Sequence, residues 1–340
     1  MTDFSENLHT GFIRLTEAGK GILLAVSGGR DSMALLHGTA QLRHVQGSGS
    51  VVVAHLNHGL RGDFSRGDAE LVRSTSERLG LSVVISECTA GALQASSRGS
   101  LEESARNARY DFLRRAAIEH GLSYVATAHH AGDQAETVLH NIVRGTGLRG
   151  MRGIPEQRPL GDSVTLIRPL LTISPDEIER FIEEQQIVFG DDATNADTSM
   201  TRNRIRHQLL PKLRSDFNPQ VDSALMRLSQ QTGEIIDCLD ALANRILSEA
   251  TLEETPLVCR LDRELLRKWP QAVIRHAITV LWTRCGWPRQ KMTTEHWTRL
   301  SEIIVGGREQ SLDFPDRLRM SCSGRVVRIE RSTQTRRANG

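Results

Sequence analysis

The sequence predicts an α/β fold built on a parallel sheet, followed by a second, mainly helical domain. From residue 21 to about residue 171, short apolar runs alternate with longer stretches whose apolar residues recur at helical spacing. This alternation is typical of repeated βαβ units around a parallel sheet. After residue 186 it stops, and a polar loop and a basic segment follow. The chain has 340 residues, more than one typical compact domain holds, so we expect two domains.

The elements of the first domain follow from apolar patterning. Continuous apolar runs predict buried strands at residues 22–26, 51–54, 81–85, 124–128 and 164–167. Helical spacing predicts helices at residues 31–42, 65–79, 101–120, 133–143 and 174–186. The last helix begins with Ser174 as N-cap, then Pro175 and two acids. Right-handed crossovers between parallel strands place ligands at the carboxyl ends of the strands.

The second domain begins near Asn218-Pro219. The chain therefore divides into a first domain at 1–217, a second at 218–332 and a frayed tail at 333–340. The second domain is predicted to hold helices at 221–247 and 269–285 and a closing β-hairpin within 317–329. Its four tryptophans are expected in the core rather than as base-stacking platforms: Trp269, Trp282, Trp287 and Trp297.

Composition excludes several classes of protein. The chain opens without a signal peptide and has no apolar run of the ~18 residues that a membrane span needs, so a soluble cytoplasmic protein without membrane partners is expected. Its five cysteines form no C-x-x-C pair, which argues against a zinc ribbon, an iron-sulfur site or a persulfide relay. No lysine lies between Lys20 and Lys212, so this region cannot hold a Walker A or Schiff-base lysine.

One loop has the features of a phosphate cradle. Ser27-Gly28-Gly29-Arg30-Asp31-Ser32 lies where the first predicted strand turns into a helix. The two glycines let backbone amides approach an anion, and the helix dipole favours negative charge there. Asp31 is poorly placed for a bare anion and well placed for a magnesium ion carried by it. A plain turn with a helix cap is the alternative, which the strand, the acid and the second serine argue against.

Paired acids and histidines lie at the same edge of the predicted sheet. Asp133 and Glu136 are three residues apart on one helical face, so they could hold a substrate ammonium or a magnesium ion. Paired acids also occur as ordinary solvated helix charges. His129 and His130 close the fourth strand, and catalysis, packing and capping all stay open for them.

Arginines form two further groups. Arg106 and Arg109 share a predicted helix with Glu102 and Glu103, so surface ion pairing is the simple alternative to a phosphate contact. A basic segment follows residue 200, with only Asp216 opposing it nearby: Arg202, Arg204, Arg206, Lys212 and Arg214. This excess of charge suits a phosphate backbone or an adenylate, although a solvated basic helix is also compatible with it.

The loop at 27–32 resembles the S-G-G-x-D-S loop of the PP-loop ATP pyrophosphatases, which cleave ATP between the α and β phosphates and adenylate a substrate oxygen. Six further motifs occur in the order of one family: residues 55–61, 102–110, 128–137, 144–151, 168–171 and 201–206. Together they resemble the tRNA(Ile)-lysidine synthases. The resemblance is dense over residues 20–215 and looser beyond.

The resemblance implies a Rossmann-like parallel sheet of the PP-loop, adenine nucleotide alpha hydrolase-like type. It also implies a two-step reaction. ATP adenylates C2 of the wobble cytidine, position 34, in an isoleucine tRNA with a CAU anticodon and releases diphosphate; the ε-amine of free L-lysine then displaces AMP. The C-terminal domain would bind the tRNA body through arginines near Arg325, Arg328 and Arg331. The oligomeric state stays open, with a homodimer as one option.

The resemblance assigns roles by position. The catalytic residues would be Asp31, Asp133, Glu136 and Arg106. ATP would be bound by residues 27–32, namely Ser27, Gly28, Gly29, Arg30, Asp31 and Ser32, together with His55. Mg²⁺ would be held by Asp31, and tRNA or the adenylate would be contacted by Arg202, Arg204 and Arg206.

One position departs from the family pattern H-H-x-D-D-Q-x-E-T, because Gly132 replaces the first aspartate. This loses one potential metal or ammonium contact and makes Asp133 the expected essential acid. Two alternatives remain: a PP-loop tRNA thiolase, which needs a reactive cysteine or cluster ligands in a matching motif, and a non-catalytic tRNA- or nucleotide-binding protein.

Overall fold

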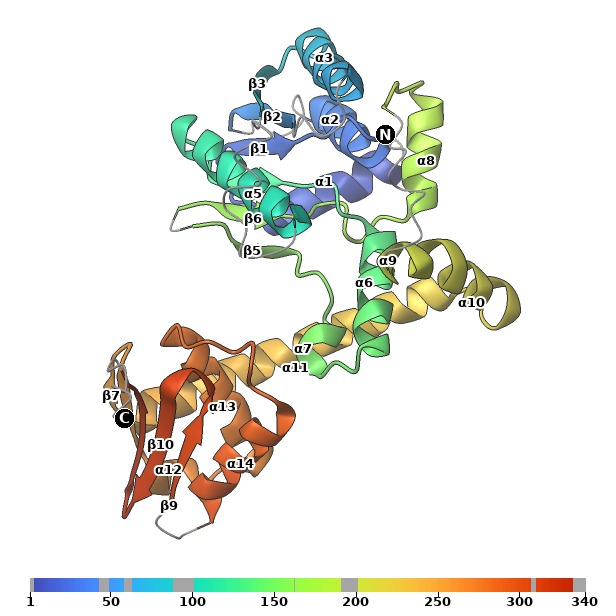
Figure 1. Ribbon diagram of the computed structural model, residues 1–340. Helices are drawn as coiled ribbons and strands as arrows, with labels where there is room; N and C mark the ends of the chain where they lie inside the picture. The colour runs from blue at the N-terminus through green and yellow to red at the C-terminus, as the bar shows by residue number, and fades with distance from the viewer. Residues whose placement is uncertain are drawn as a thin grey trace, which may run out of the picture. The chain divides into compact units, whose positions relative to one another are not determined.

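The computed structural model describes residues 3–42, 49–57, 63–87, 101–161, 163–190, 201–306 and 310–332, without the side chains of 63–66 and 101–103. The predicted tail at 333–340, the polar loop at 191–197, the motif residues 58–61 and Cys88 lie outside these ranges. The chain divides into two compact units, residues 1–230 and 231–340 (Figure 1). This division falls inside one long helix, thirteen residues after the boundary proposed from the sequence.

The first unit is built on a six-stranded sheet in the order β3-β2-β1-β4-β6-β5. All five predicted strands are confirmed, and they pair in parallel: β1 (Ile22–Ala25), β2 (Val51–Asn57), β3 (Ser82–Glu87), β4 (Tyr124–Ala126) and β6 (Thr165–Ile167). The sixth strand, β5 (Gln157–Pro159), was not predicted and pairs antiparallel to β6 at the edge. Its short, polar sequence gives no apolar run, and Pro159 suits an edge position.

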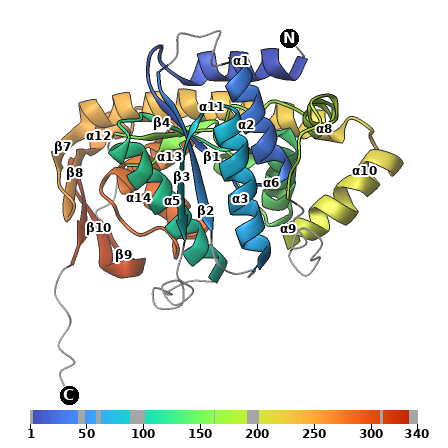
Figure 2. The ribbon, with the colours of Figure 1, turned by 90° about the horizontal axis from the view of Figure 1, so that it is seen from above.

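Helices cover both faces of this sheet. They are needed on both because successive residues of β1 are apolar and point to opposite faces. Leu24 belongs to one apolar cluster, with side chains of α1 (Asp3–Leu15), α2 (Arg30–Leu42), α3 (Asp63–Arg78) and α8 (Pro175–Glu184). Leu23 points to the other face, where α5 (Leu101–Glu119) packs. Figure 2 shows α5 on one side of the strands and α2 and α3 on the other. Consecutive residues of a strand point to opposite faces, so burial on both is typical of a parallel sheet.

The predicted start of α8 is confirmed in detail. The Oγ of Ser174 accepts a hydrogen bond from the backbone N–H of Glu177 at 3.2 Å, and the Glu177 carboxylate accepts one from the N–H of Ser174 at 3.0 Å. This reciprocal pair satisfies two amides that the helix leaves without partners. Helix α1 was not predicted, although Phe4, Leu8 and Phe12 follow helical spacing and are buried.

The rest of the first unit is a helical layer beyond the sheet. It holds α6 (Ala131–Val143), α7 (Leu148–Met151), α9 (Thr201–Arg204), the π-helical turn η2 (Ile205–Leu209), α10 (Leu210–Asp216) and the start of α11 (Val221–Ala250). Gln134 joins these parts. Its amide donates to the carbonyls of Arg152 and Ile154, both at 3.1 Å, and to Ser229 Oγ at 2.7 Å. Helix α6, which carries the predicted acids, is therefore held in place from its buried side.

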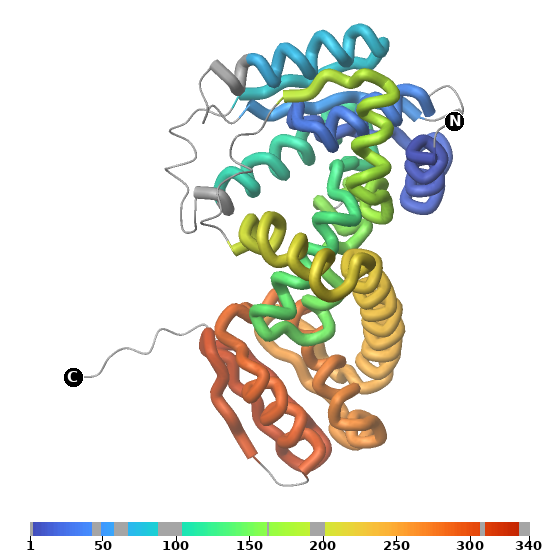
Figure 3. Tube along the Cα trace, turned by 90° about the vertical axis from the view of Figure 1, so that its right-hand side faces the viewer, coloured from blue at the N-terminus to red at the C-terminus, as the bar shows by residue number. Residues whose placement is uncertain are grey.

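The second unit combines helices with a five-stranded antiparallel sheet in the order β7-β8-β11-β10-β9. The strands are β7 (Thr251–Glu254), β8 (Val258–Asp262), β9 (Gln310–Phe314), β10 (Leu318–Ser323) and β11 (Val326–Arg331). The helices are α12 (Arg263–Leu266), α13 (Gln271–Arg284), α14 (Thr294–Val305) and the turn η3 (Pro315–Arg317). The predicted hairpin is confirmed as β10 and β11, whereas β7, β8 and β9 were missed. Figure 3 shows the red strands beside the orange helices of this unit.

The tryptophans form the centre of this second core, as predicted. Trp282 is fully buried and meets Trp287 and Trp297 edge to face, with ring centroids 5.0 and 5.2 Å apart. Its indole N–H donates to the carbonyl of Pro288 at 3.0 Å. Trp269 is partly buried against the same cluster. Three cysteines also lie buried here, at Cys259, Cys285 and Cys322, while Cys238 is exposed. Throughout the described ranges, no helix is long and apolar enough to cross a membrane.

Candidate active site at the carboxyl ends of the parallel strands

The loop predicted to cradle phosphate joins β1 to α2 and is braced by its own serines. Ser32 Oγ accepts a hydrogen bond from the N–H of Ser27 at 3.1 Å and donates one to the carbonyl of Gly29 at 2.8 Å. Gly28 has a φ of +95°, a conformation that L side chains rarely adopt. A Cβ at Gly28 would also lie 3.2 Å from the Cβ of Asp68, on α3. The conformation therefore favours glycine, and a side chain here would also crowd Asp68.

Asp31 opens α2 and stays ionised. Its Oδ1 lies 3.3 Å from Arg30 Nε, and its Oδ2 lies 3.5 Å from His130 Nε2. Burial raises the pKa of this carboxyl, but the hydrogen bond and charge of His130, with the charge of Arg30, lower it below its ordinary value overall. A carboxylate beside a phosphate-binding loop suits Mg²⁺, which usually takes one or two carboxylates together with phosphate oxygens and waters. Among the described residues, no cluster of three or more metal-ligating side chains occurs.

His130 caps α6, which is one of the three roles left open for it. Its Nδ1 accepts the N–H of Gly132 at 3.0 Å, while its own backbone N–H donates to Asp133 Oδ2 at 3.1 Å. Its Nε2 lies 3.5 Å from Asp31 Oδ2 and 3.7 Å from Asp133 Oδ2. One buried imidazole therefore links the phosphate-binding loop to the acid on α6.

The two carboxylates also set the protonation of His130. Burial lowers its pKa, but the hydrogen bond to Asp31 and the charges of Asp133 and Asp31 raise the pKa above the ordinary value. The bond from Gly132 works against this rise, because it needs an unprotonated Nδ1. Gly132 also has little room for a side chain, since a Cβ would lie 2.8 Å from His130 Cε1 and 3.0 Å from Pro175 Cγ. The His130 ring and Pro175 therefore fill the space beside Gly132, the position at which the family pattern has its first aspartate.

His129 is held differently from its neighbour. Its Nδ1 lies 3.0 Å from Thr127 Oγ1. Burial lowers its pKa to about 4, and the positive charges of Arg168, Arg202 and Arg106 lower it further, against the opposing charge of Asp133. His129 is therefore neutral at pH 7, whereas the pKa of His130 is shifted in the opposite direction, above its ordinary value.

The structure brings the two predicted acids together with two of the three predicted arginines. Arg206 Nη2 lies 3.1 Å from Asp133 Oδ1, and Arg206 Nε donates to Glu136 Oε1. Arg202 Nε lies 3.4 Å from Glu136 Oε2, and its Nη2 lies 3.6 Å from Asp133 Oδ1. Burial lowers the pKa of Arg206, but these carboxylates raise it overall. Glu136 is only 4% exposed, so neither acid is an ordinary solvated charge.

The third arginine of that segment stands apart. Arg204 is exposed and forms no ion pair with any described side chain. Arg202 and Arg206 are four residues apart and share a helical face, and Arg206 lies in the π-helical turn η2. Such turns often occur at functional sites.

His55 lies in β2, whereas Arg106 lies on α5, the helix that covers one face of the sheet. His55 is 3% exposed, and its Nδ1 donates to the carbonyl of Val26 at 2.9 Å. Burial lowers its pKa, so the ring is neutral and Nε2 is an acceptor, with no partner among the described residues. Arg106 lies on α5, with Cζ 5.6 Å from the centre of the Tyr110 ring. The alternative pairing of Arg106 with Glu102 and Glu103 involves side chains outside the described part.

Sequence reasoning assigned no role to two residues at this edge, although Arg168 belongs to the motif at 168–171. Arg168 directly follows β6 and is 2% exposed. Its position at the carboxyl end of a parallel strand is the signal that could have identified it. Asp68, whose side chain lies against Gly28, comes from the middle of α3, and nothing local in the sequence distinguishes it.

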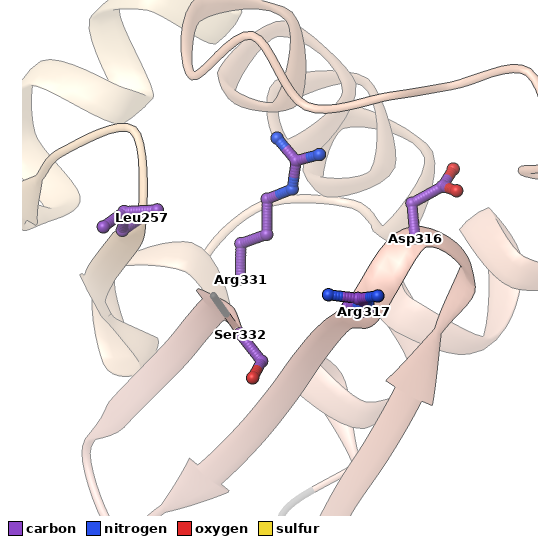
Figure 4. Close-up of a pocket in the computed structure, with 5 residues that line it drawn as sticks. All are labelled: Leu257, Asp316, Arg317, Arg331 and Ser332. Carbon is purple, nitrogen blue, oxygen red and sulfur yellow. The ribbon is translucent and has the colours of Figure 1, made fainter. Parts of the chain in front are cut away.

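The second unit has a cavity of its own, of about 380 Å³, lined by Leu257, Asp316, Arg317, Arg331 and Ser332 (Figure 4). The three arginines expected to bind tRNA differ in whether they form ion pairs. Arg325 pairs with Asp262 at 2.6 Å and Arg328 with Glu330 at 2.8 Å. Arg331 forms no ion pair within the described residues and lines the cavity.

Comparison with known proteins first defines the class. The model of the PP-loop domain matches residues 3–213. A solved structure, the U34-tRNA thiolase NcsA from Methanococcus maripaludis with its [4Fe-4S] cluster, matches with a TM-score of 0.56 and 16% identity over 67% of this chain and 77% of that one. That likeness supports the fold alone, and fold and loop together define a PP-loop ATP-binding protein.

Curated relatives then define the family. A tRNA(Ile)-lysidine synthase from Nostoc sp. is 33% identical, over 88% of this chain and 88% of the relative. Synthases of the same name from Rhodopirellula baltica and Chlorobaculum tepidum are 36% and 38% identical, over 83% and 72% of this chain and 79% and 71% of theirs. The chain belongs to the tRNA(Ile)-lysidine synthase family, a family of ATP-dependent ligases.

Proposed function

We propose that this chain ligates L-lysine to C2 of the wobble cytidine, position 34, of an isoleucine tRNA with a CAU anticodon, forming lysidine. The observation that carries the proposal is one sheet edge at which a phosphate-binding loop, Asp31 and the pair Asp133 and Glu136 are linked through His130. Family membership supplies the substrates. The reaction then divides into an adenylation and an amine transfer.

In the first step, the C2 oxygen of the cytidine attacks the α-phosphorus of ATP, the bond to the β-phosphate bridge breaks, and diphosphate leaves. Backbone amides at the start of α2 and the dipole of that helix hold the phosphates. Ser27 adds a hydroxyl donor. Asp31, whose lowered pKa keeps it ionised, would hold Mg²⁺ together with phosphate oxygens. The ion would neutralise charge that builds up on the leaving diphosphate.

His55 suits the nucleotide in another way. Its Nδ1 is fixed on Val26, the residue that leads into the phosphate-binding loop, so its Nε2 offers a buried lone pair. A buried acceptor without a partner is unfavourable. A donor group of the nucleotide, such as an amine or a ribose hydroxyl, would satisfy it.

In the second step, the ε-amine of lysine attacks C2, the bond from C2 to the adenylate oxygen breaks, and AMP leaves. Asp133 and Glu136 would hold the lysine ammonium, and one of these carboxylates would accept the proton that the ammonium gives up before the amine attacks. Arg202 and Arg206 neutralise these acids, so they must exchange the carboxylates for another anion. The phosphate of the adenylate is such an anion. This exchange would couple formation of the adenylate to exposure of the lysine site.

The C-terminal part, residues 218–332, would bind the body of the tRNA, with 1–217 as the catalytic domain. Arg331 supports this role, because it lines a cavity and forms no ion pair with a described side chain. Deleting residues 220–340 would also cut α11, so substitution of Arg331 is the gentler test.

The function is tested by incubating the protein with ATP, Mg²⁺, labelled lysine and a transcript of the isoleucine tRNA with a CAU anticodon. The proposal expects label in the tRNA, with one AMP released per lysine, and no label when the anticodon cytidine is replaced by uridine. Nucleotide binding without turnover would favour a non-catalytic tRNA- or nucleotide-binding protein. AMP release that depends on a sulfur donor instead of lysine would favour a thiolase.

A further inference from the structure

We propose that Arg106, Arg158 and Arg168, gathered around Tyr110, form a phosphate-binding site beside the adenylation centre, and that a phosphate of the tRNA backbone occupies it. This inference rests on the proposed function for the identity of the RNA. It concerns a cluster of cations on α5, on β5 and at the end of β6, of which only Arg106 was expected to take part in the reaction.

Three guanidinium groups converge on one ring. Arg158 Cζ lies 4.6 Å and Arg106 Cζ lies 5.6 Å from the centre of the Tyr110 ring. Arg168 is close enough for its charge to act on the same tyrosine. Burial raises the pKa of the Tyr110 hydroxyl, but Arg106, a hydrogen bond from Arg158 and the charge of Arg168 lower it overall. The surroundings of this hydroxyl are therefore strongly positive.

The cluster lacks counter-charge within the described part of the chain. None of the three arginines forms an ion pair with a described carboxylate, and the nearby Glu156 pairs with Arg14 at 2.8 Å. Burial, together with the like charges of Arg158 and Arg106, lowers the pKa of Arg168. Arginine nevertheless keeps its proton in proteins. Arg106 is exposed, Arg158 is partly buried and Arg168 is buried, and like charges held together in this way are unfavourable until an anion enters.

Arg168 shows where the anion would bind. The side chain is 2% exposed and is anchored by a hydrogen bond from Nη1 to the carbonyl of Pro155 at 2.6 Å. Its Nε is buried and has no acceptor among the described residues. A buried donor of this kind normally finds a partner, and a charged one forms strong bonds to phosphate oxygens. The geometry of a guanidinium suits a phosphate better than a single chloride ion.

The position of the cluster favours RNA over ATP. The phosphate-binding loop leads into α2, which packs on the sheet face of Leu24, whereas α5 packs on the opposite face with Leu23 (Figure 2). Arg168 directly follows β6, and His129 lies three residues after the end of the neighbouring parallel strand β4. A base that reaches the reaction centre at this edge brings its own phosphodiester with it. A second anion site on the α5 side would hold that backbone in place.

The test compares Arg158→Gln with Arg115→Gln, a matched control on the exposed side of α5. Equilibrium binding of the isoleucine tRNA is measured over a salt series, without ATP or lysine. Arg158→Gln is expected to weaken binding about tenfold, since a hydrogen bond between charged groups contributes about that much. The slope of log affinity against log salt should fall by roughly 0.7 to 0.9. Arg115→Gln should leave both near wild type.

Two further measurements keep the outcomes separable. The KM for ATP is measured in the same variants: a rise of about tenfold with unchanged tRNA affinity would keep the phosphate site but assign it to the nucleotide. Arg168→Lys, which keeps the charge and loses the Nε donor, should give a smaller loss in the same direction as Arg158→Gln. If Arg158→Gln and Arg168→Lys match Arg115→Gln in tRNA affinity, salt slope and KM for ATP, the site does not exist. Because tRNA affinity and its salt slope are measured without turnover, these two readouts are distinct from a failure of lysine transfer.

Discussion

Arginines are used differently in the two units of this protein. At the sheet edge of the first unit, Arg202 and Arg206 contact acids assigned to the reaction, and Arg106, Arg158 and Arg168 have no acidic partner within the described residues. In the second unit most arginines near the sheet pair with local acids, as Arg325 does with Asp262 and Arg284 with Glu254. The comparison shows that the described arginines near the sheet of the second unit are mostly paired with local acids, whereas a group of arginines at the sheet edge of the first unit is not.

This difference between the two units also means that the net charge of the whole chain is a poor guide to RNA binding. A formal net charge of +2 over 340 residues suggests no strong attraction to RNA. Local pairing changes this picture, because an arginine bound to a neighbouring carboxylate is largely neutralised and an unpaired one is not. Positions on which RNA binding depends should therefore be found by their lack of partners rather than by counting basic residues.

The largest effect is expected from Asp133→Asn. Asparagine can still accept the capping hydrogen bond from His130, so the fold should survive, but the charge that holds an ammonium is lost. We expect lysine transfer to fall about 10²- to 10³-fold. The measurement is the rate of lysine incorporation, with Asp222→Asn, whose carboxylate pairs with Arg214, as the control. An AMP release rate equal to wild type in Asp133→Asn would show that this acid is not essential.

Arg206→Lys should have the next largest effect. Lysine keeps the charge but cannot reach Asp133 and Glu136 together, nor bind a phosphate in the bidentate way. We expect kcat to fall about 10- to 100-fold, with a smaller change in the KM for ATP. The control is Arg214→Lys, which alters an ion pair with Asp222 on the neighbouring helices. Equal kcat values in the two variants would contradict the proposed exchange of partners.

A smaller effect is expected in the second unit, where an unpaired arginine and a paired arginine can be compared directly. Arg331→Gln should weaken tRNA binding about three- to tenfold, because loss of one phosphate contact reduces affinity modestly. Arg328→Gln, which only breaks a pair with Glu330, should leave tRNA affinity near wild type. Binding curves at fixed salt measure both. A larger loss in Arg328→Gln than in Arg331→Gln would overturn the rule that unpaired arginines bind RNA.

The smallest effect concerns stability against pH. His129 has a pKa of about 4 in the folded protein and an ordinary value near 6.5 when unfolded. Between these values the unfolded chain binds a proton that the folded chain does not, so the free energy of unfolding falls as the pH drops from 6.5 to 4. His129→Gln should reduce that fall by on the order of 1–3 kcal/mol.

The measurement is chemical denaturation at pH 7, 6, 5 and 4, with the exposed His120→Gln as control. The contribution of His130 to stability changes with pH in the opposite direction. Its pKa is raised, so its contribution to stability is complete below about pH 6.5 and is lost as the pH rises through the raised value. An unchanged acid slope in His129→Gln would contradict the assigned burial of this ring.

Elements of the first unit could be predicted because local pattern and burial agree there. Strands such as β1 are apolar on both faces, and α8 carries a complete capping box. β5 could not be predicted, since its three residues are polar and proline and its pairing depends on β6. In the second unit, β7 reads Thr-Leu-Glu-Glu and is largely exposed, so apolar patterning gives little signal for it. Strands of this kind are defined by their partners rather than by their own sequences.

Part of the site could also be predicted from sequence. Motif spacing places Asp31 and Asp133 at the ends of neighbouring strands, and the rule of carboxyl ends brings them to one edge. The capping role of His130 depends on its rotamer and on Gly132, which spacing does not specify. The contact of Arg206 with Glu136 joins residues 70 apart through a π-helical turn. Arg204 lies two residues from both Arg202 and Arg206, so helical spacing alone places it on another face.

The central claim is that the sheet edge of the first unit forms an adenylated cytidine before lysine is used. It is tested by incubating the wild-type protein with Mg²⁺, the isoleucine tRNA and ATP labelled in the α-phosphate, without lysine, and quenching under conditions that preserve phosphate esters. We expect label on the tRNA, lost as AMP within one turnover after lysine is added. Absence of label on the tRNA, in protein that still transfers lysine, would contradict it, as would label that stays on the tRNA when lysine arrives.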